Sequence, residues 1–274
     1  MIGIAFSVKD PAGKGIADFI KNYYSLEKSD ECKNAVECYV GKNFYLVGFR
    51  EDVIYFEFLD ERIPENTKEY IILSRHSSTK GIKSYTVHHT GNFGEALYGG
   101  RKRALAVANP ITAHKLLKLL RNNCIDAGKD AEYEVSYEAT HHGPTENDKP
   151  LCFIEIGSTL SEWKDPVNHK IVGQAVIELL EDPKHVCREI AIGIGGGHYP
   201  RKHTALAIQE NICYGHIMAK YALSYLNDEM LSLMTERCMP KPRTIIVEKK
   251  GTRREHREII EKYVEVENMI VRYI

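Results

Sequence analysis

Residues 151–159 read Leu-Cys-Phe-Ile-Glu-Ile-Gly-Ser-Thr and give the clearest indication of the fold class. Its first six residues are apolar except for Glu155. A near-continuous apolar run of this length is typical of a parallel strand that is covered on both faces. Residues 188–194 read as a second buried strand; the first run leads into Gly-Ser-Thr and the second into Gly-Gly-Gly-His. Both runs therefore predict central strands of an α/β sheet whose ends carry the ligand-binding loops.

Outward from these two runs, strand-like and helix-like segments alternate along the chain. This alternation predicts an α/β fold, a three-layer sandwich with a mixed, mainly parallel sheet. We expect residues 1–274 to form a single unit, in which any subdivision falls at the Gly-, Lys- and Arg-rich residues 98–103. Further strands are predicted at 2–7, 43–49, 53–58, 69–73, 132–139 and 244–247, and helices at 15–24, 104–122, 168–180, 215–225 and 253–264.

The composition narrows the classes of function. The chain has 274 residues, 43% of them hydrophobic, and a net charge of -1. The net charge does not indicate nucleic-acid binding, so a nucleic-acid substrate would need a local basic patch on the protein surface. No apolar run is long enough to span a membrane, and the N-terminus lacks the pattern of a signal peptide. Seven scattered cysteines indicate reduced thiols. We therefore expect a cytoplasmic protein with no membrane association and no stable protein partner.

Histidine is the most informative residue type in this sequence. Four segments that follow predicted strands carry histidine beside serine, threonine or glycine, and a rigid sheet can aim such loops at one site. Adjacent residues on an extended backbone point in opposite directions, so we expect one histidine of each adjacent pair to face the site. The histidines concerned are His76, His88 and His89, His141 and His142, and His198 with His203.

Glu155 stands inside an apolar strand, where a carboxylate is almost never found without a partner. We interpret it as a metal ligand or an acid/base group; the alternative is a salt bridge to a covering helix. Catalytic zinc takes three protein ligands and keeps one position for water. The predicted ligands are His76, His89, His142, Glu155 and His203, with the choice inside each adjacent pair left open. Zinc or a histidine would then activate a water.

The turn at residues 195–198 reads Gly-Gly-Gly-His. Glycine-rich turns expose backbone N–H groups that can form an anion nest or an oxyanion hole. We predict that the amides of Gly196 and Gly197 lie near an oxyanion, and that Arg201 and Lys202 attract phosphate or a chain terminus. The alternative is a flexible glycine loop with surface charges.

Two residues directly after the central strand, Ser158 and Thr159, are further candidates for substrate binding. Thr159 and Glu162 also fit the Ser/Thr-x-x-Glu pattern that caps the start of a helix.

Five motifs together resemble the archaeal and plant type of D-aminoacyl-tRNA deacylase, in the family's order along most of the chain. The resemblance implies hydrolysis of the ester between a D-amino acid and the 3'-terminal ribose of tRNA. It also implies a zinc cofactor, a D-aminoacylated tRNA as partner and a phosphorylase/hydrolase-like α/β fold. The motifs are Ser-Arg-His-Ser-Ser at 74–78, His-His-Thr-Gly-Asn at 88–92, His-His-Gly-Pro-Thr at 141–145, Glu-Ile-Gly-Ser-Thr at 155–159 and Gly-Gly-Gly-His-Tyr at 195–199.

We therefore predict a D-aminoacyl-tRNA deacylase in which an activated water attacks the ester carbonyl. His76, His142, Glu155 and His198 are the predicted catalytic residues. Two other functions stay open, namely a metal-dependent amidase or peptidase of the same architecture and a non-catalytic tRNA-binding protein. The mechanism requires Glu155 and His198 to meet at one cleft.

Overall fold

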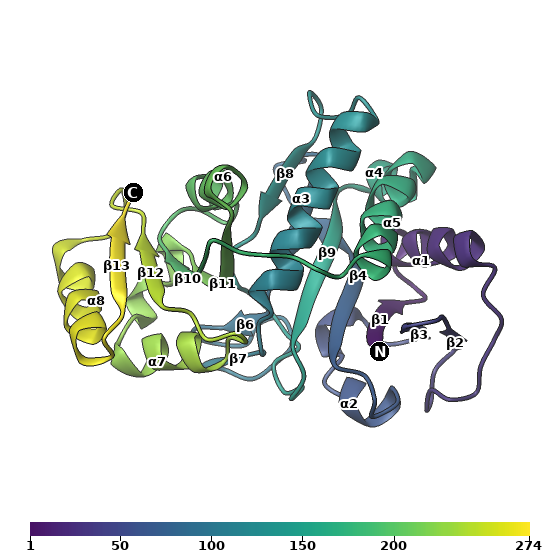
Figure 1. Ribbon diagram of the computed structural model, residues 1–274, viewed down its shortest axis with the longest axis horizontal. Coiled ribbons are helices and arrows are strands. Elements are labelled where there is room, and N and C mark those ends of the chain that lie inside the picture. The colour runs from purple at the N-terminus through teal and green to yellow at the C-terminus, as the bar shows by residue number, and fades with distance from the viewer.

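The computed structural model describes residues 1–274 and contains two main β-sheets (Figure 1). The larger sheet has seven strands in the order β2-β3-β1-β4-β9-β5-β8. Neighbouring strands are parallel except at the β2–β3 and β5–β9 pairs. Its strands are β1 (Ile2–Ser7), β2 (Glu37–Val40), β3 (Phe44–Phe49), β4 (Glu69–Ser77), β5 (Ser84–His88), β8 (Glu134–Tyr137) and β9 (Leu151–Ser158).

The smaller sheet has four parallel strands in the order β11-β10-β12-β13. They are β10 (Glu189–Ile194), β11 (Ile212–Met218), β12 (Thr244–Val247) and β13 (Ile270–Tyr273). Two short antiparallel strands, β6 (Gly91–Asn92) and β7 (Ala104–Leu105), stand apart from both sheets. Residues 98–103 lie in the loop that joins β6 to β7, whereas the chain passes from the large sheet to the small one between β9 and β10.

Helices cover the sheets, and the predicted α/β fold with a mixed, mainly parallel sheet is confirmed (Figure 1). The helices α1 (Pro11–Tyr24), α3 (Pro110–Asp126), α4 (Leu160–Lys164) and α5 (Pro166–Glu181) lie along one side of the large sheet. The small sheet is accompanied by α6 (Arg201–Glu210), α7 (Asp228–Glu236) and α8 (Arg254–Val266). The remaining helix is the short α2 (Leu59–Arg62).

The central strand β9 is buried on both faces, as its apolar sequence predicts. Ile154 and Ile156 belong to the largest hydrophobic cluster, which also holds residues of α1, α3 and α5. The intervening Phe153 belongs to a different cluster, together with Phe56 and Leu59. This alternation is the two-residue period of a strand, so one strand contributes to two cores.

Two local predictions are wrong, and helices α2, α6 and α7 were not predicted. Residues 53–58 form a 3-10 turn (Val53–Tyr55) instead of a strand, because Val53 and Phe56, three positions apart, turn into the same core. Residues 215–225 begin as the end of β11, because pairing with β10 holds the chain extended, and they continue as a 3-10 helix (Lys220–Tyr225). Helix α6 starts directly after Pro200.

The expectation of seven reduced thiols is also wrong for four of them. Cys32 pairs with Cys38, and Cys187 pairs with Cys213 across 26 residues. The other three cysteines are free and buried. The fold brings Cys187 and Cys213 together, so sequence spacing alone does not reveal the pair.

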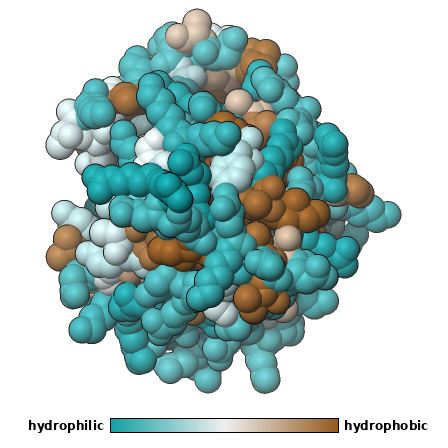
Figure 2. All heavy atoms as spheres, turned by 90° about the vertical axis from the view of Figure 1, so that its left-hand side faces the viewer, coloured by the Kyte–Doolittle hydropathy of each residue, from teal (hydrophilic) through white to brown (hydrophobic).

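The outer face that carries the small sheet is mainly hydrophilic, with apolar side chains in separate patches (Figure 2). None of the helices combines the length and apolar character that a bilayer span demands.

Candidate active site

Neighbouring strands of the large sheet bring histidines and carboxylates to one place. His76 lies on β4 and pairs with Gly157 of β9, and Glu155 lies on β9 two residues before Gly157. Glu155 pairs with Thr86 of β5 on its other side, and His88 ends that strand. Glu138 comes directly after β8. Because positions two apart on a strand share a face, these side chains point to the same side of the sheet.

The small sheet adds His198, which follows β10. Two backbone hydrogen bonds join the sheets at this point. The N–H of Ala139 donates to the carbonyl of His198 at 2.8 Å, and the N–H of Thr140 donates to the carbonyl of Ile217 at 2.8 Å. His198 is thereby held against the segment that carries Glu138.

Glu138 is the centre of the arrangement, and its side chain is fully buried. One carboxylate oxygen, Oε1, lies 3.0 Å from Nδ1 of His76. The other, Oε2, lies 2.8 Å from Nε2 of His198 and 3.6 Å from Nε2 of His141. A second buried carboxylate, Glu155, lies 3.5 Å from both Nδ1 of His76 and Nε2 of His88. Glu155 and His198 therefore belong to one group of side chains, in which His76 and Glu138 lie between them.

These side chains form one group, which we call the histidine–glutamate cluster. Three of its imidazoles have a fixed tautomer. Nδ1 of each lies within hydrogen-bond distance of a backbone carbonyl: 3.2 Å from that of His89 for His88, 2.8 Å from that of Ala139 for His141, and 2.6 Å from that of Gly143 for His142. A carbonyl only accepts, so Nδ1 carries the hydrogen, and Nε2 keeps its lone pair whenever the ring is neutral. The cluster consists of His76, His88, Glu138, His141, His142, Glu155 and His198.

The cluster shifts the protonation of its members. Burial acts to lower the pKa of His76, but hydrogen bonds and charge attraction from Glu138 and Glu155 outweigh it and raise the pKa to about 10. Burial acts in the opposite direction on Glu138, where His198 and His76 hold the pKa of the carboxyl well below its usual range. Burial, reinforced by the charge of His88, lowers the pKa of His142 to about 4. The cluster thus combines anionic carboxylates with both charged and neutral imidazoles.

Both histidines of the 141–142 pair face the cluster, so the expectation that only one of them would do so is wrong. Their ring centroids are 4.3 Å apart, and both come close to His88. The reason is the backbone: His142 has φ of 45°, in the left-handed region, so the pair does not lie on an extended chain.

A cleft of about 890 Å³ opens beside His76 and His198. Gly196 and Gly197 line it, and their N–H groups donate to no acceptor within the chain. Gly196 has φ of +83°, which favours glycine. The lining also includes five cationic side chains and one carboxylate: Lys80, Arg201, Lys202, Lys220, Lys250 and Glu248.

With this geometry in place, comparison with known proteins assigns the family. The family model described as D-aminoacyl-tRNA deacylase matches residues 63–272. A D-aminoacyl-tRNA deacylase of Staphylothermus marinus is 63% identical, with 99% of each chain covered. One of Desulfurococcus amylolyticus is 57% identical over the whole of both chains.

The chain belongs to the D-aminoacyl-tRNA deacylase family. It is therefore a hydrolase. A crystal structure of a conserved protein of unknown function has the same fold, with a TM-score of 0.91 at 31% identity, and the match covers all of this chain and 95% of the other.

Two of the predicted metal ligands, His89 and His203, lie outside the histidine–glutamate cluster. His89 points away from the cluster: its Nδ1 lies 3.0 Å from the carbonyl of Leu151, and its ring packs near His216. His203 is fully buried on α6 and packs against Tyr214.

Ser158 and Thr159 also differ from the residues that line the cleft. Ser158 is buried without a hydrogen-bond partner for its hydroxyl. Thr159 caps α4, and Glu162 completes the capping box that the sequence predicts. The hydroxyl of Thr159 lies 2.7 Å from a carboxylate oxygen of Glu162.

Sequence reasoning missed Glu138, and it left open which member of the 88–89 and 141–142 histidine pairs faces the site. Residues 132–139 alternate charged and apolar types, which is typical of a half-exposed strand, so Glu138 looked solvated. Its position directly before the 139–145 segment was the available signal, because that segment carries the His141–His142 pair. The lysines at 80, 220 and 250 gave no local signal, since they come from three separated turns.

The donor atoms fit the zinc ion that the family resemblance implies. One ligand atom each from His88, His141 and His142 lies within 4.8 Å of the others, as do atoms from His76, Glu138 and His198. Nε2 of His88 and both carboxylate oxygens of Glu138 are buried without a hydrogen-bond partner of suitable geometry. Imidazole and carboxylate are ordinary zinc ligands, and three of them with an open side describe a catalytic site.

Proposed function

We propose that this enzyme hydrolyses the ester between a D-amino acid and the 3'-terminal ribose of tRNA, with a water activated at the histidine–glutamate cluster. One observation carries the proposal: a buried cluster of imidazoles and carboxylates opens directly into a cleft lined by cations. The named relatives supply the substrate, since each is described as a D-aminoacyl-tRNA deacylase.

Glu138 and His198 are the residues that we assign to proton transfer. Oε2 of Glu138 lies 2.8 Å from Nε2 of His198, and we assign to this carboxylate the role of keeping the hydrogen on Nε2. Nδ1 of His198 is then free to take a proton from a water in the cleft and to return it to the ribose oxygen. The side chain of His198 is 34% exposed, which gives it access to that water.

The ester carbonyl acquires negative charge as the water attacks, and this charge needs donors. The amides of Gly196 and Gly197 are free of acceptors within the chain and line the same cleft as His198. Preorganised backbone donors at a developing oxyanion contribute about 3 kcal/mol each. We assign these two amides to that role.

His88, His141 and His142 would hold zinc through Nε2, because their Nδ1 atoms are engaged by carbonyls. When bound, zinc lowers the pKa of a coordinated water to about 7 and polarises a carbonyl. The protein supplies the dry pocket and the backbone contacts that orient each ring.

The cationic lining of the cleft suits the phosphates at the end of a tRNA. Lys80, Lys220 and Lys250 come from three different turns and surround the cleft together with Arg201 and Lys202. Arg201 is held by two hydrogen bonds to Glu134, of 2.8 and 2.7 Å, so its position is fixed. Such a patch can bind the backbone of a nucleic acid although the chain as a whole carries a net charge of -1.

The test is deacylation of matched D- and L-tyrosyl-tRNA, with zinc supplied and then with a chelator. We expect release of D-tyrosine and free tRNA at a rate well above that for the L form, and loss of this activity after chelation with recovery on adding zinc. Small amide substrates tested in parallel should stay intact. D-tyrosyl-tRNA that survives prolonged incubation with metal would exclude the activity, and unchanged turnover after chelation would exclude the zinc route alone.

A further inference from the structure

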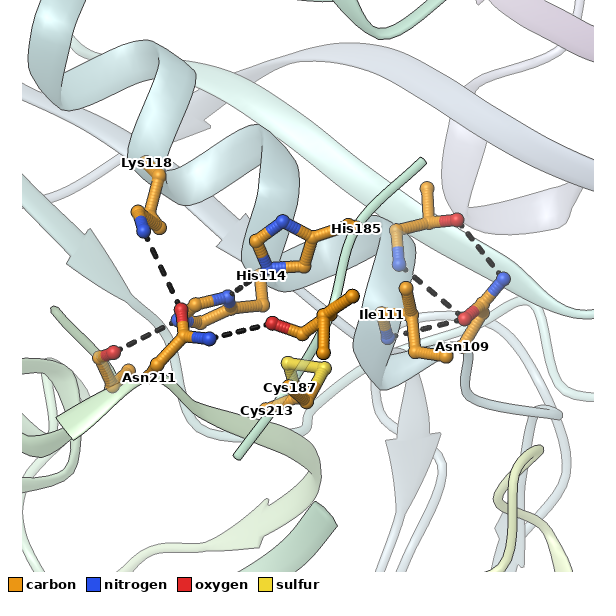
Figure 3. Close-up of a disulfide and its surroundings, with 11 residues drawn as sticks. Asn109, Ile111, His114, Lys118, His185, Cys187, Asn211 and Cys213 are labelled. Carbon is orange, nitrogen blue, oxygen red and sulfur yellow. Dashed lines mark hydrogen bonds between the residues drawn. A yellow bond between two sulfur atoms is a disulfide. The ribbon is translucent and has the colours of Figure 1, made fainter. Parts of the chain in front are cut away.

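A second group of metal-binding side chains lies at the other end of the small sheet. Cys187 stands just before β10, and Cys213 stands near the start of β11. His185 belongs to the segment that joins α5 to β10, and His114 lies on α3 (Figure 3). His198 follows the opposite end of β10, so this group is separate from the histidine–glutamate cluster. We call it the histidine–cysteine cluster.

Its two histidines face each other in a defined tautomer. His114 is fully buried, and its Nε2 lies 2.8 Å from the carbonyl of Ala207. Because the carbonyl accepts, Nε2 carries the hydrogen and Nδ1 keeps the lone pair. That Nδ1 lies 2.6 Å from Nε2 of His185. Figure 3 shows both rings beside the disulfide, and one nitrogen of each ring and the sulfur of Cys213 lie within 4.8 Å of one another.

The joining segment is held in place by contacts other than the disulfide. The N–H of Arg188 donates to the carbonyl of Asn211 at 2.9 Å, and the side-chain amide of Asn211 donates to the carbonyl of Val186. Nζ of Lys115 donates to the carbonyl of Lys184 at 2.9 Å. These contacts keep His185 and Cys187 facing α3 and β11 whether or not the two sulfur atoms are bonded.

We propose that the reduced protein binds one zinc-like divalent cation here, through the thiolates of Cys187 and Cys213 and the imidazoles of His114 and His185. Two cysteines and two histidines are an ordinary ligand set for a structural zinc ion, which is four-coordinate and closed. The ion would replace the disulfide as the cross-link between the joining segment, β11 and α3.

The metal replaces the disulfide in two steps. A dithiol reductant attacks the disulfide, takes both sulfur atoms of Cys187 and Cys213 to thiols and leaves as its own cyclic disulfide. The two thiols then release two protons as the cation binds both sulfurs. The cation itself is neither oxidised nor reduced.

Cobalt(II) is the probe that separates the two clusters, because thiolate ligands give it a charge-transfer band that imidazole and carboxylate ligands do not. The experiment uses the full chain with Cys32→Ser and Cys38→Ser, which removes the other disulfide. The protein is measured oxidised, and again after reduction with a dithiol that is then removed. His185→Gln tests the imidazole ligand, and His256→Gln on α8 is the matched control.

We expect the thiolate band to appear at one cobalt per chain only after reduction, and zinc to abolish it. His185→Gln should weaken cobalt binding by more than the about tenfold that loss of an outer-shell partner costs, whereas His256→Gln should leave binding unchanged. Zinc should also restore the melting temperature that reduction lowers, in the control but not in His185→Gln. A reduced protein without the band, or equal affinity in both variants, would overturn the proposal.

Discussion

The two histidine clusters at opposite ends of the small sheet differ in what surrounds their imidazoles. In the histidine–glutamate cluster, the buried carboxylates of Glu138 and Glu155 contact four histidines, and a cleft opens beside His198. In the histidine–cysteine cluster, the partners are the sulfur of Cys213 and a backbone carbonyl, and no carboxylate belongs to the group. Open sites with carboxylates suit catalysis, and closed sites with thiolates suit structure.

A count of histidines alone therefore does not locate an active site. His216 is also buried, but its Nε2 lies near the carbonyls of Ala106 and Arg237 and its Nδ1 near the hydroxyl of Thr140. Every nitrogen of that ring is used by the fold. A histidine becomes available for chemistry where its partner is a carboxylate and its other nitrogen reaches a cavity, as with His198.

Removing the charge of Glu138 is the most direct test of the difference between the two clusters. We expect Glu138→Gln to lower kcat/KM for D-aminoacyl-tRNA by about 10³-fold, because His76 and His198 lose their shared anionic partner. Glu132→Gln, whose side chain is half exposed just upstream, is the matched control and should retain full activity. Activity of Glu138→Gln within tenfold of the parent, in protein shown to be folded, would contradict the role given to this carboxylate.

A second comparison sets His198 against His216. We expect His198→Gln to lower kcat by about 10²-fold with little change in melting temperature, since its side chain is partly exposed. His216→Gln should leave kcat unchanged but lower the free energy of unfolding by about 1–3 kcal/mol, because buried carbonyls lose their donor. Thermal unfolding and single-turnover rates measured on both variants separate the two effects. Similar loss of kcat in both would remove the distinction.

The cationic cleft predicts a smaller effect, on substrate binding. Lys220→Ala and Lys250→Ala should each raise KM for tRNA and reduce the slope of log KM against log salt by about 0.7, the value for one phosphate contact of a single strand. Lys262→Ala, an exposed lysine on α8, is the control. If all three variants have the same salt slope as the parent, the tRNA end lies elsewhere.

The histidine–cysteine cluster predicts the smallest effect on turnover. Under non-reducing conditions, replacing Cys187 and Cys213 by serine should lower the free energy of unfolding by about 3.5 kcal/mol, from chain entropy over 26 residues. The same change at Cys32 and Cys38, six residues apart, should lower it by about 2 kcal/mol. Neither pair should alter deacylation at 25 °C. Chemical unfolding followed by circular dichroism measures both values.

Much of the fold could be predicted because a continuous apolar run in the sequence indicates a strand that is buried in the protein. Residues 151–156 and 188–194 read as central strands, and both lie at the heart of a sheet. Residues 215–225 failed because pairing with β10, which is far away in sequence, decides their extended form. The helix periodicity seen there is local, whereas the strand ladder is not.

The site could be predicted only in part, for a similar reason. His76, His142, Glu155 and His198 all lie in one cluster, as their positions after buried strands suggest. The partner that joins them, Glu138, sits in a segment whose alternation imitates a solvent-facing strand. Its burial depends on histidines from β4 and β10, and no window of sequence contains all of these.

The two backbone hydrogen bonds that tie Ala139 and Thr140 to the small sheet have a mechanical consequence. Glu138 belongs to one sheet and His198 to the other, so their contact exists only while the two sheets are docked. A motion that opens this joint would separate Glu138 from His198 and, under the proposed mechanism, stop turnover without altering any side chain. We therefore expect the rate of deacylation to depend also on how firmly the large and small sheets are docked.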